Sequence, residues 1–381
     1  MTIHWCGTGL SAVPGLRRLI EAGFEVTVWN RSLDKAKDAV GDITNRIQVF
    51  DMGSLAAELQ QGDVLVSMLP GEWHVPLAEL CISKSANMVS SSYISPEMMA
   101  LDADAKRAGV ALVNEVGLDP GIDHLMAHWL VADYRDAKNY DNDAVVSFIS
   151  YCGGVPKHPN AFRYKFSWSP LGVLKALRSP SRSIRAFSEL TIQRPWDAIT
   201  SYVAPLAAPE SFEVYPNRDS IPFVKQYDFD DAWQIREFVR GTLRLNGWAE
   251  AWADVFQEIG TLEGPKGEAR LKEMSDAFWA EFAYDEGEPD RVILCVALMA
   301  EVDGNPVYHK TYTLDAWGDL RGSAMARLVS VTVSLAVEAV QNHAIQVGVT
   351  AAPHDRKLID QWLTEINGQA QHMQVVDHVR H

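Results

Sequence analysis

The first residues that could do chemistry form a short glycine-containing run after an apolar segment at the start of the chain. The run 7–12 reads G-x-G-x-x-A and lies between an expected strand at 2–6 and an expected helix. In such a turn, backbone amides and the amino end of the helix can bind a pyrophosphate. The position of the run predicts a dinucleotide site. The alternative interpretation of the run is that its two glycines only shape a strand-to-helix turn and bind no dinucleotide.

The end of the second expected strand, residues 24–29, is where a dinucleotide site distinguishes NAD from NADP. Asn30, Arg31 and Ser32 follow this strand, and no acidic residue stands there to accept a hydrogen bond from a ribose 2′-hydroxyl group. A guanidinium group can pair with a 2′-phosphate, and a serine hydroxyl can donate to it. We therefore expect NADP, with NAD possible, and a solvated strand-end arginine as the alternative for Arg31.

Two further polar segments end the strands expected at 64–69 and 86–90. A Pro70-Gly71 break follows the first, and a serine run, 90–92, with Tyr93 ends the second. Ligands of open α/β sheets bind beyond the carboxyl ends of the strands, so both segments are expected near the nicotinamide. On position alone, the serines could equally be ordinary loop residues.

The elements that would position these residues alternate between strands and helices. Six strands are expected at 2–6, 24–29, 47–50, 64–69, 86–90 and 110–114. Their spacing is typical of a parallel, doubly wound sheet. After Ser95 the sequence predicts one helix, in which Met98, Leu101, Ala105 and Ala108 share a face.

From Asp143 the pattern changes to longer strands, beginning at 145–151, followed by a helical stretch at 231–284. Residues 291–302 and 307–314 are expected to pair as a β-hairpin. The sequence thus predicts an α/β protein with an N-terminal Rossmann domain at 1–120, completed by 323–381. It also predicts an α+β substrate domain at 121–240 and 285–322, and a small helical insert at 241–284.

Composition narrows the possible partners. The chain is 47% hydrophobic and 22% charged, with a formal net charge of −16. This acidity argues against nucleic acid or an anionic membrane as a partner, and it means that an anionic substrate needs a local cluster of arginines. The apolar run 324–344 contains Arg327 and Glu338, so we expect a buried amphipathic helix.

Four widely spaced cysteines, Cys6, Cys81, Cys152 and Cys295, fit neither a disulfide framework nor a zinc site. We expect reduced thiols, no metal and a cytoplasmic protein, because disulfides persist mainly in oxidising compartments. The sequence does not determine the oligomeric state.

Several longer motifs, in one order, resemble those of the glutamate-forming saccharopine dehydrogenases. They lie at 91–96, 114–124, 150–154, 164–169, 215–220 and 240–244. The resemblance covers about residues 1–248 and resumes near 285, and the helical stretch between is shorter than in the fungal enzymes. It implies an oxidoreductase that interconverts saccharopine, water and NAD(P)+ with glutamate, 2-aminoadipate 6-semialdehyde and NAD(P)H.

The resemblance also implies which residues bind the ligands, and the arginines and the aspartate suit a substrate with several carboxylate and amine groups. The implied cofactor contacts are Gly7, Thr8, Gly9, Leu10, Ser11, Asn30, Arg31, Ser32, Asp51, Met52, Leu69, Ser91, Ser92, Leu118, Asp119, Pro120 and Ser167. The implied substrate contacts are Ser92, Tyr93, Asp119, Arg218, Thr242, Leu243 and Arg244. The candidate catalytic residues are Asp119, Tyr93 and Cys152.

Structural alternatives remain for several of these residues. Asp119, directly before a proline, could instead cap a helix, and Cys152 could be a buried apolar residue. His124 is expected to be structural, and no general base is identified. Arg218 and Arg244 could be surface arginines paired with acids such as Asp219 or Glu237.

Two other functions stay open at this point. One is a carboxyspermidine-type dehydrogenase. Its substrate would have fewer carboxylates, so the pair of arginines argues against this function. A non-catalytic NADP-binding sensor would keep the fold without the chemistry.

Overall fold

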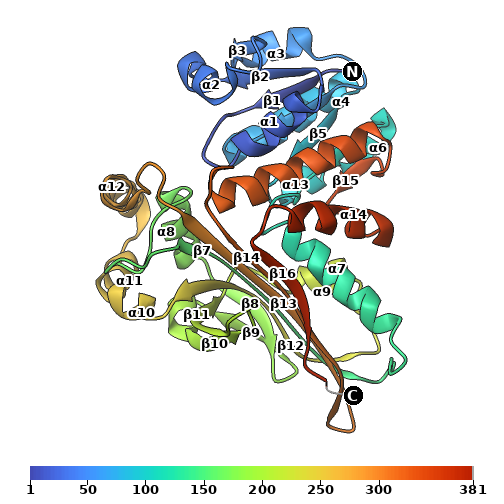
Figure 1. The fold of residues 1–381 in the computed structure, drawn as a ribbon, viewed down its shortest axis with the longest axis vertical. Helices are drawn as coiled ribbons and strands as arrows, with labels where there is room; N and C mark the ends of the chain where they lie inside the picture. The colour runs from blue at the N-terminus through green and yellow to red at the C-terminus, as the bar shows by residue number, and fades with distance from the viewer. Residues whose placement is uncertain (380–381) are drawn as a thin grey trace. The chain divides into compact units, whose positions relative to one another are not determined.

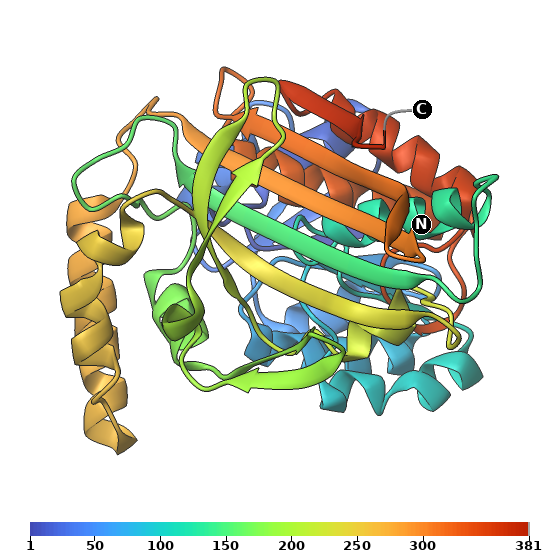
Figure 2. The same ribbon diagram turned by 90° about the horizontal axis from the view of Figure 1, so that it is seen from below.

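The computed structural model describes residues 1–379 and divides into two compact units. Unit 1 is Met1–Leu125 with Met325–Gln369, and unit 2 is Met126–Ala324 with the residues from Ala370 onward. Each unit is built on its own β-sheet (Figures 1 and 2).

Unit 1 contains short strands and the helices between them. Its strands are β1 (Ile3–Cys6), β2 (Val26–Asn30), β3 (Ile47–Val49), β4 (Val64–Ser67), β5 (Asn87–Ser90), β6 (Ala111–Val113) and β15 (Gly348–Thr350). Its helices are α1 (Val13–Glu21), α2 (Leu33–Val40), α3 (Met52–Glu58), the 3₁₀ turn η1 (Gly71–Trp73), α4 (His74–Lys84), α5 (Pro96–Met99), α6 (Asp102–Ala108) and α14 (Arg356–Asn367). Two helices, α7 (Ile122–Arg135) and α13 (Ala324–Gln341), contain residues of both units.

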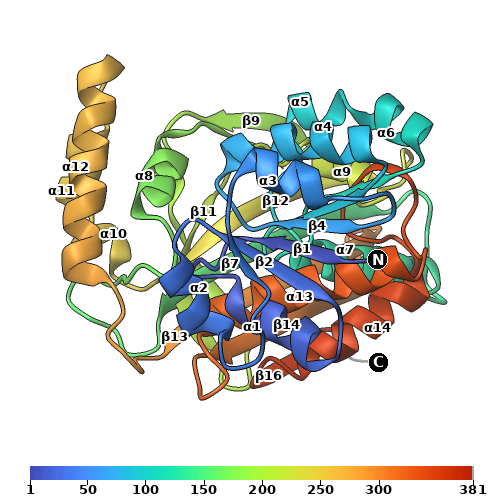
Figure 3. The ribbon, with the colours of Figure 1, turned by 90° about the horizontal axis from the view of Figure 1, so that it is seen from above.

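The seven strands of unit 1 form a parallel sheet in the order β15-β6-β5-β4-β1-β2-β3. Helices α3 to α6 cover one face, and α1, α13 and α14 lie on the other (Figure 3). The doubly wound Rossmann fold expected from the sequence is confirmed. The sequence analysis did not predict β15, which is three residues long.

The helix expected after Ser95 is two helices. Ser95 caps the first one, since its Oγ atom accepts a hydrogen bond from the Met98 amide at 3.1 Å. α5 ends at Met99 and α6 begins at Asp102, but Met98 and Ala105 are buried in the same apolar cluster. The predicted buried face is therefore correct, although the helix along it is broken.

Unit 2 has longer strands than unit 1. Its strands are β7 (Val145–Pro156), β8 (Ser181–Arg185), β9 (Ser188–Ile192), β10 (Thr200–Ala204), β11 (Glu210–Pro216), β12 (Gln234–Leu245), β13 (Asp290–Val302), β14 (Asn305–Trp317) and β16 (His372–Asp377). Its helices are α8 (Pro170–Arg178), the 3₁₀ turn η2 (Pro195–Ala198), α9 (Pro222–Gln226), α10 (Trp248–Ala251), α11 (Ala253–Ile259) and α12 (Gly264–Phe282).

The sheet of unit 2 is mixed, with the strand order β10-β11-β12-β7-β13-β14-β16 (Figure 2). β12 and β7 run parallel, and the other neighbours on this path are antiparallel. The expected hairpin is confirmed as β13 and β14. Its turn residues Asp303 and Gly304 have φ angles of 52° and 76°, as a tight hairpin turn requires.

Two sequence predictions for this unit are wrong. The helical stretch expected at 231–284 begins only at Trp248, because β12 occupies Gln234–Leu245 in the middle of the sheet. The boundary expected between residues 240 and 241 therefore falls inside a strand. The tail does not all complete the Rossmann domain, because β16 pairs with β14. Partners so distant in sequence leave no local signal.

The apolar helix α13 belongs to the interior of the protein. By length and composition it could cross a membrane, yet 78% of its 18-residue window is buried. The expectation of a buried helix is confirmed. Its contact with α1 is close, because the Gly15 amide donates to Ser330 Oγ at 2.7 Å.

This contact generates a prediction for stability. A Cβ atom at Gly15 would lie 1.9 Å from the Ser330 carbonyl oxygen, so Gly15→Ala must push two helices apart. Such overpacking costs about 1–3 kcal/mol or more, which outweighs the roughly 1 kcal/mol that alanine adds to a helix. We expect a lower melting temperature. Gly71→Ala, where no atom lies within 4 Å, is the control, and equal melting temperatures for both variants would contradict the prediction.

Candidate functional site

The loop between β1 and α1 has the backbone that a pyrophosphate needs. Gly7 has a left-handed φ of 103°, and a Cβ atom there would lie 2.9 Å from the Met68 carbonyl oxygen. Both the backbone angle and the space exclude a side chain. α1 starts after Ala12, whose side chain does not cap the helix. In its first turn Pro14 has no amide hydrogen and the Gly15 amide donates to Ser330 Oγ, so the Val13 amide is the one available to an anion.

A buried hydroxyl group in the same loop lacks a protein partner. Thr8 Oγ1 has no hydrogen-bond partner within residues 1–379. A buried polar atom in this state costs about 1–3 kcal/mol. A phosphate oxygen would accept a hydrogen bond from it, so the loop fits the pyrophosphate of a dinucleotide. The expected contacts Gly9 and Leu10 are exposed here, and Ser11 is half-buried.

The end of β2 contains the residues expected to select the cofactor. The Asn30 side chain joins two loops, because Oδ1 accepts from the Thr8 amide at 3.2 Å and Nδ2 donates to the Ser32 carbonyl at 2.8 Å. Ser32 caps α2 by accepting from the Lys35 amide at 3.3 Å. Arg31 is exposed between these two polar residues, where a 2′-phosphate could reach its guanidinium group.

Three further residues of the expected cofactor site have structural roles in unit 1. Asp51 caps α3 by accepting from the Ser54 amide at 2.8 Å, and this bond holds the pKa of the Asp51 carboxyl below its usual range. Met52 and Leu69 pack against an apolar cluster that contains Trp29. Their contacts with a cofactor stay predictions.

Tyr93 and Asp119, in the loops after β5 and β6, contact each other. The Tyr93 hydroxyl group donates to Asp119 Oδ1 at 2.8 Å. Asp119 is half-buried, and Gly121, not Asp119, is the residue directly before α7. This placement favours a ligand-binding role for the aspartate over helix capping. Leu118 and Pro120, on either side of it, are buried.

A buried glutamate holds the same two loops together, and sequence analysis did not identify it. Glu115 Oε1 accepts from the Ile94 amide at 3.0 Å, and Oε2 lies 3.1 Å from His124 Nε2. His124 is fully buried, and its Nδ1 lies 3.5 Å from Asp123 Oδ2. The histidine is therefore part of the scaffold that positions the loops. Glu115 has a left-handed φ of 56°, and no sequence pattern predicts this conformation.

His74 is a second residue that sequence analysis missed. Its Nδ1 lies 3.0 Å from Ser67 Oγ at the end of β4, and its Nε2 lies 2.9 Å from Ser92 Oγ after β5. The imidazole thus joins the ends of two neighbouring strands. The sequence signal that could have identified His74 is its position shortly after the Pro70-Gly71 break, where a ligand-binding loop was expected. The adjacent Ser91 packs closely on Gly117, where a Cβ atom would lie 2.9 Å from that of Ser91.

In unit 2, Arg244 is a buried arginine without a carboxylate partner. It is 5% exposed, its Nε atom has no hydrogen-bond partner, and none of the described residues forms an ion pair with it. Its guanidinium carbon lies 4.7 Å, 5.4 Å and 5.7 Å from the ring centroids of Tyr164, Trp248 and Tyr215. The aromatic faces stabilise the cation, but a buried charge still favours an anionic partner.

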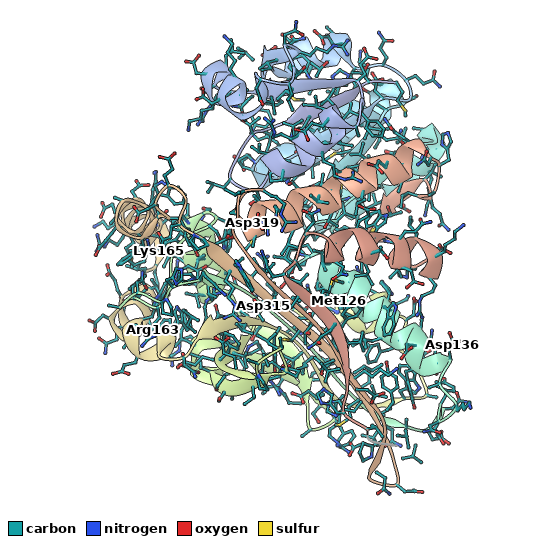
Figure 4. The ribbon with its side chains drawn as sticks, viewed as in Figure 1. Met126, Asp136, Arg163, Lys165, Asp315 and Asp319 are labelled. Carbon is teal, nitrogen blue, oxygen red and sulfur yellow. The ribbon has the colours of Figure 1, made fainter. Side chains whose placement is uncertain are left out.

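Arg291 shows how the same unit satisfies a structural arginine. Its Nε and Nη2 atoms each donate at 2.7 Å to a different carboxylate oxygen of Asp315, which is labelled in Figure 4. A third nitrogen, Nη1, donates to Glu210 at 3.1 Å. No carboxylate in residues 1–379 is arranged in this way around Arg244.

The acidic residues near Arg244 in the sheet have other partners. Glu213 lies opposite Arg244 in the register of β11 and β12, but its carboxylate accepts from the amides of Gly247 and Ala249. Two acids pair with other arginines: Asp219 with Arg182, and Glu237 with Arg185. The alternative in which Arg244 is a surface arginine paired with such an acid is therefore wrong.

Three residues lie side by side on neighbouring strands of this sheet: Cys152 on β7, Thr242 on β12 and Tyr215 on β11. Arg244 follows Thr242 on the same face, because side chains alternate along a strand. Leu243 points to the opposite face and is buried in a separate apolar cluster. A ligand on the Arg244 face could therefore meet only the backbone of Leu243.

The remaining predicted residues of unit 2 lie in loops. Arg218 follows β11, is exposed and has a left-handed φ of 57°, and its carbonyl accepts from the Arg182 amide at 2.8 Å. Ser167 is half-buried ahead of α8. Ligand contacts from both residues stay predictions.

Comparisons with known proteins agree along nearly the whole chain. The model of the saccharopine dehydrogenase NADP binding domain matches residues 6–113, and that of the saccharopine dehydrogenase C-terminal domain matches residues 117–371.

Two relatives carry the same name, saccharopine dehydrogenase [NADP(+), L-glutamate-forming]. The one from Pyricularia oryzae is 35% identical over 263 residues, which is 67% of this chain and 57% of that protein. The one from Schizosaccharomyces pombe is 27% identical, and the match covers 92% of this chain and 93% of that protein. The chain thus spans little more than half of the Pyricularia protein.

Solved structures show the same fold. Saccharopine dehydrogenase (L-Glu forming) from Saccharomyces cerevisiae matches with a TM-score of 0.83 and 24% identity, over 99% of this chain and 100% of that one. A homospermidine synthase from Legionella pneumophila matches with a TM-score of 0.62 and 11% identity, over 99% and 91%. The two family models together match most of the sequence, and we conclude that the chain belongs to the saccharopine dehydrogenase family.

Proposed function

We propose that the chain interconverts L-saccharopine, NADP+ and water with L-glutamate, 2-aminoadipate 6-semialdehyde and NADPH, and that it prefers NADP to NAD. Family membership and the names of its relatives support this reaction. The observation that carries it is the buried guanidinium group of Arg244, which pairs with no carboxylate among residues 1–379.

Unit 1 would hold the cofactor. The 7–11 loop and the amino end of α1 suit the pyrophosphate, and Arg31 and Ser32 suit a 2′-phosphate. A nicotinamide cofactor held there would supply the hydride acceptor for the substrate carbon next to the secondary amine. The protein has to hold that carbon in position and keep the amine neutral at the moment of transfer.

The substrate groups would meet residues of opposite charge. We assign a substrate carboxylate to Arg244, with Arg218 as a second carboxylate ligand, and a substrate amine to Asp119. The hydrogen bond from Tyr93 orients the Asp119 carboxylate. Cys152, next to Thr242 in the sheet, would line the same face as Arg244. Following NADPH absorbance with saccharopine and each nicotinamide cofactor tests the whole proposal, and absence of turnover would refute it.

Replacing Arg31 tests the cofactor preference. Arg31→Ala removes a charge-assisted partner of the 2′-phosphate, worth about 1.5–3 kcal/mol, so the Kd for NADP should rise roughly ten- to hundredfold. The Kd for NAD should barely change. Arg46→Ala is the control, because Arg46 is also exposed in unit 1 but pairs with Glu25. Equal losses with both cofactors would remove Arg31 from the site.

Replacing Asp119 separates ligand binding from scaffolding. Asp119→Asn keeps an oxygen that can accept from Tyr93 but removes the charge that would face a substrate amine. We expect the turnover of saccharopine to fall by more than about tenfold, with little change in melting temperature. Loss of stability with unchanged kinetics would instead show a structural role.

Replacing Arg244 tests the carboxylate site itself. Removing one partner of a desolvated charge pair costs about 2–5 kcal/mol, and lysine cannot copy the planar fork of a guanidinium group. Arg244→Lys should therefore lower kcat/KM for saccharopine by roughly thirtyfold or more, without changing NADP affinity in the absence of substrate. Arg270→Lys, an exposed arginine paired with Glu258, should leave kcat/KM unchanged. Normal kinetics for Arg244→Lys would reopen the choice of substrate.

A further inference from the structure

Three polar side chains form a hydrogen-bonded row at the carboxyl ends of β4 and β5. Ser67 Oγ lies 3.0 Å from His74 Nδ1, and His74 Nε2 lies 2.9 Å from Ser92 Oγ. Ser67 is 1% exposed and His74 is 7% exposed, while Ser92 at the end of the row is half-buried. The row therefore runs from the interior of unit 1 to a residue that a ligand could reach.

Ser67, at the buried end of the row, determines which atom donates and which accepts in each of the two hydrogen bonds. Among the described residues, the one hydrogen-bond partner of Ser67 Oγ is Nδ1 of His74. A buried hydroxyl hydrogen without an acceptor costs about 1–3 kcal/mol, whereas an unused lone pair is better tolerated. The Ser67 hydroxyl group thus donates to His74 Nδ1.

The hydrogen bond from Ser67 determines the tautomer of His74, and the tautomer determines the hydrogen bond to Ser92. Burial lowers the pKa of the His74 imidazole, so the ring is neutral at pH 7 despite the nearby carboxylate of Glu72. A neutral imidazole has one donor and one acceptor nitrogen. Because Nδ1 accepts from Ser67, Nε2 carries the hydrogen and donates to Ser92 Oγ.

The backbone of Ser92 is held as well. Its amide donates to Ser90 Oγ at 3.1 Å, and its carbonyl accepts from the Glu115 amide at 3.0 Å. With Ser92 Oγ already accepting from His74, the hydroxyl hydrogen of Ser92 has to point to another acceptor.

We propose that His74 is a positioning residue which makes the Ser92 hydroxyl group a hydrogen-bond donor to an oxygen atom of the bound ligand. This inference rests on the proposed function for the nature of the ligand. The oxygen belongs either to a substrate carboxylate or to the carboxamide of the nicotinamide, since both can accept one hydrogen bond.

A double-mutant cycle tests the proposal through activity. His74→Asn removes the donor at Nε2 and should lower kcat/KM for saccharopine about tenfold, whereas His74→Gln, which can place an amide N–H near that position, should restore most of it. Ser92→Ala should cost as much as His74→Asn, and combining the two should cost no more than Ser92→Ala alone. Additive losses, as a purely structural role would give, would overturn the proposal.

Two comparisons complete the kinetic test. A higher KM for saccharopine with unchanged NADPH affinity assigns the oxygen to the substrate, and a higher Kd for NADPH assigns it to the carboxamide. His4→Gln is the matched control, because His4 is a buried histidine of unit 1 that bonds Trp29 and Asp63. It should leave the kinetics unchanged, although it can lower stability.

Nitrogen NMR of the histidine side chains tests the row without any turnover. At pH 7, the His74 signals, assigned by their loss in His74→Asn, should report the neutral tautomer with hydrogen on Nε2. Ser67→Ala should remove this preference. A hydrogen on Nδ1 in the wild type would overturn the proposal. If the wild type shows the expected tautomer but does not turn over saccharopine, only the proposed reaction fails.

Discussion

A polar group inside a protein needs a hydrogen-bond partner, and this requirement shapes both units. Glu115, Glu213 and Arg291 are largely buried, and each has partners from a neighbouring segment. Several buried polar atoms depart from the pattern, and two of them, the hydroxyl group of Thr8 and the Nε atom of Arg244, lie in the expected binding segments and have no partner within residues 1–379. Because leaving them so is costly, these two positions point to an oxygen-rich, anionic ligand.

In unit 1, side-chain bridges between loops decide where the site residues stand. Asn30 connects the glycine loop to the end of β2, and Glu115 connects the loop of Tyr93 to that of Asp119. Each bridge crosses from one strand end to the next. The parallel sheet brings the loops to one edge, but the bridges set their positions within it.

In unit 2, aromatic rings make a buried cation tolerable in an acidic protein. The faces of Tyr164, Trp248 and Tyr215 surround the guanidinium group of Arg244, and they replace part of its hydration without neutralising it. A carboxylate of the protein at this place would compete with a ligand. Glu213, its cross-strand neighbour, instead binds two backbone amides at the start of α10.

The sequence by itself determined the Rossmann sheet, the hairpin of β13 and β14, the glycine loop and the buried nature of α13, because each has a local signature in spacing or composition. It did not reveal that β12 is a central strand, that β16 joins the second sheet, or that the helix after Ser95 is broken, since these depend on distant pairing and on packing. The resemblance of its motifs indicated Arg244 and Asp119. Only the tertiary structure decided that Arg244 is buried without an acidic partner among residues 1–379, and that His74 lies between Ser67 and Ser92, because such contacts depend on how separate segments pack.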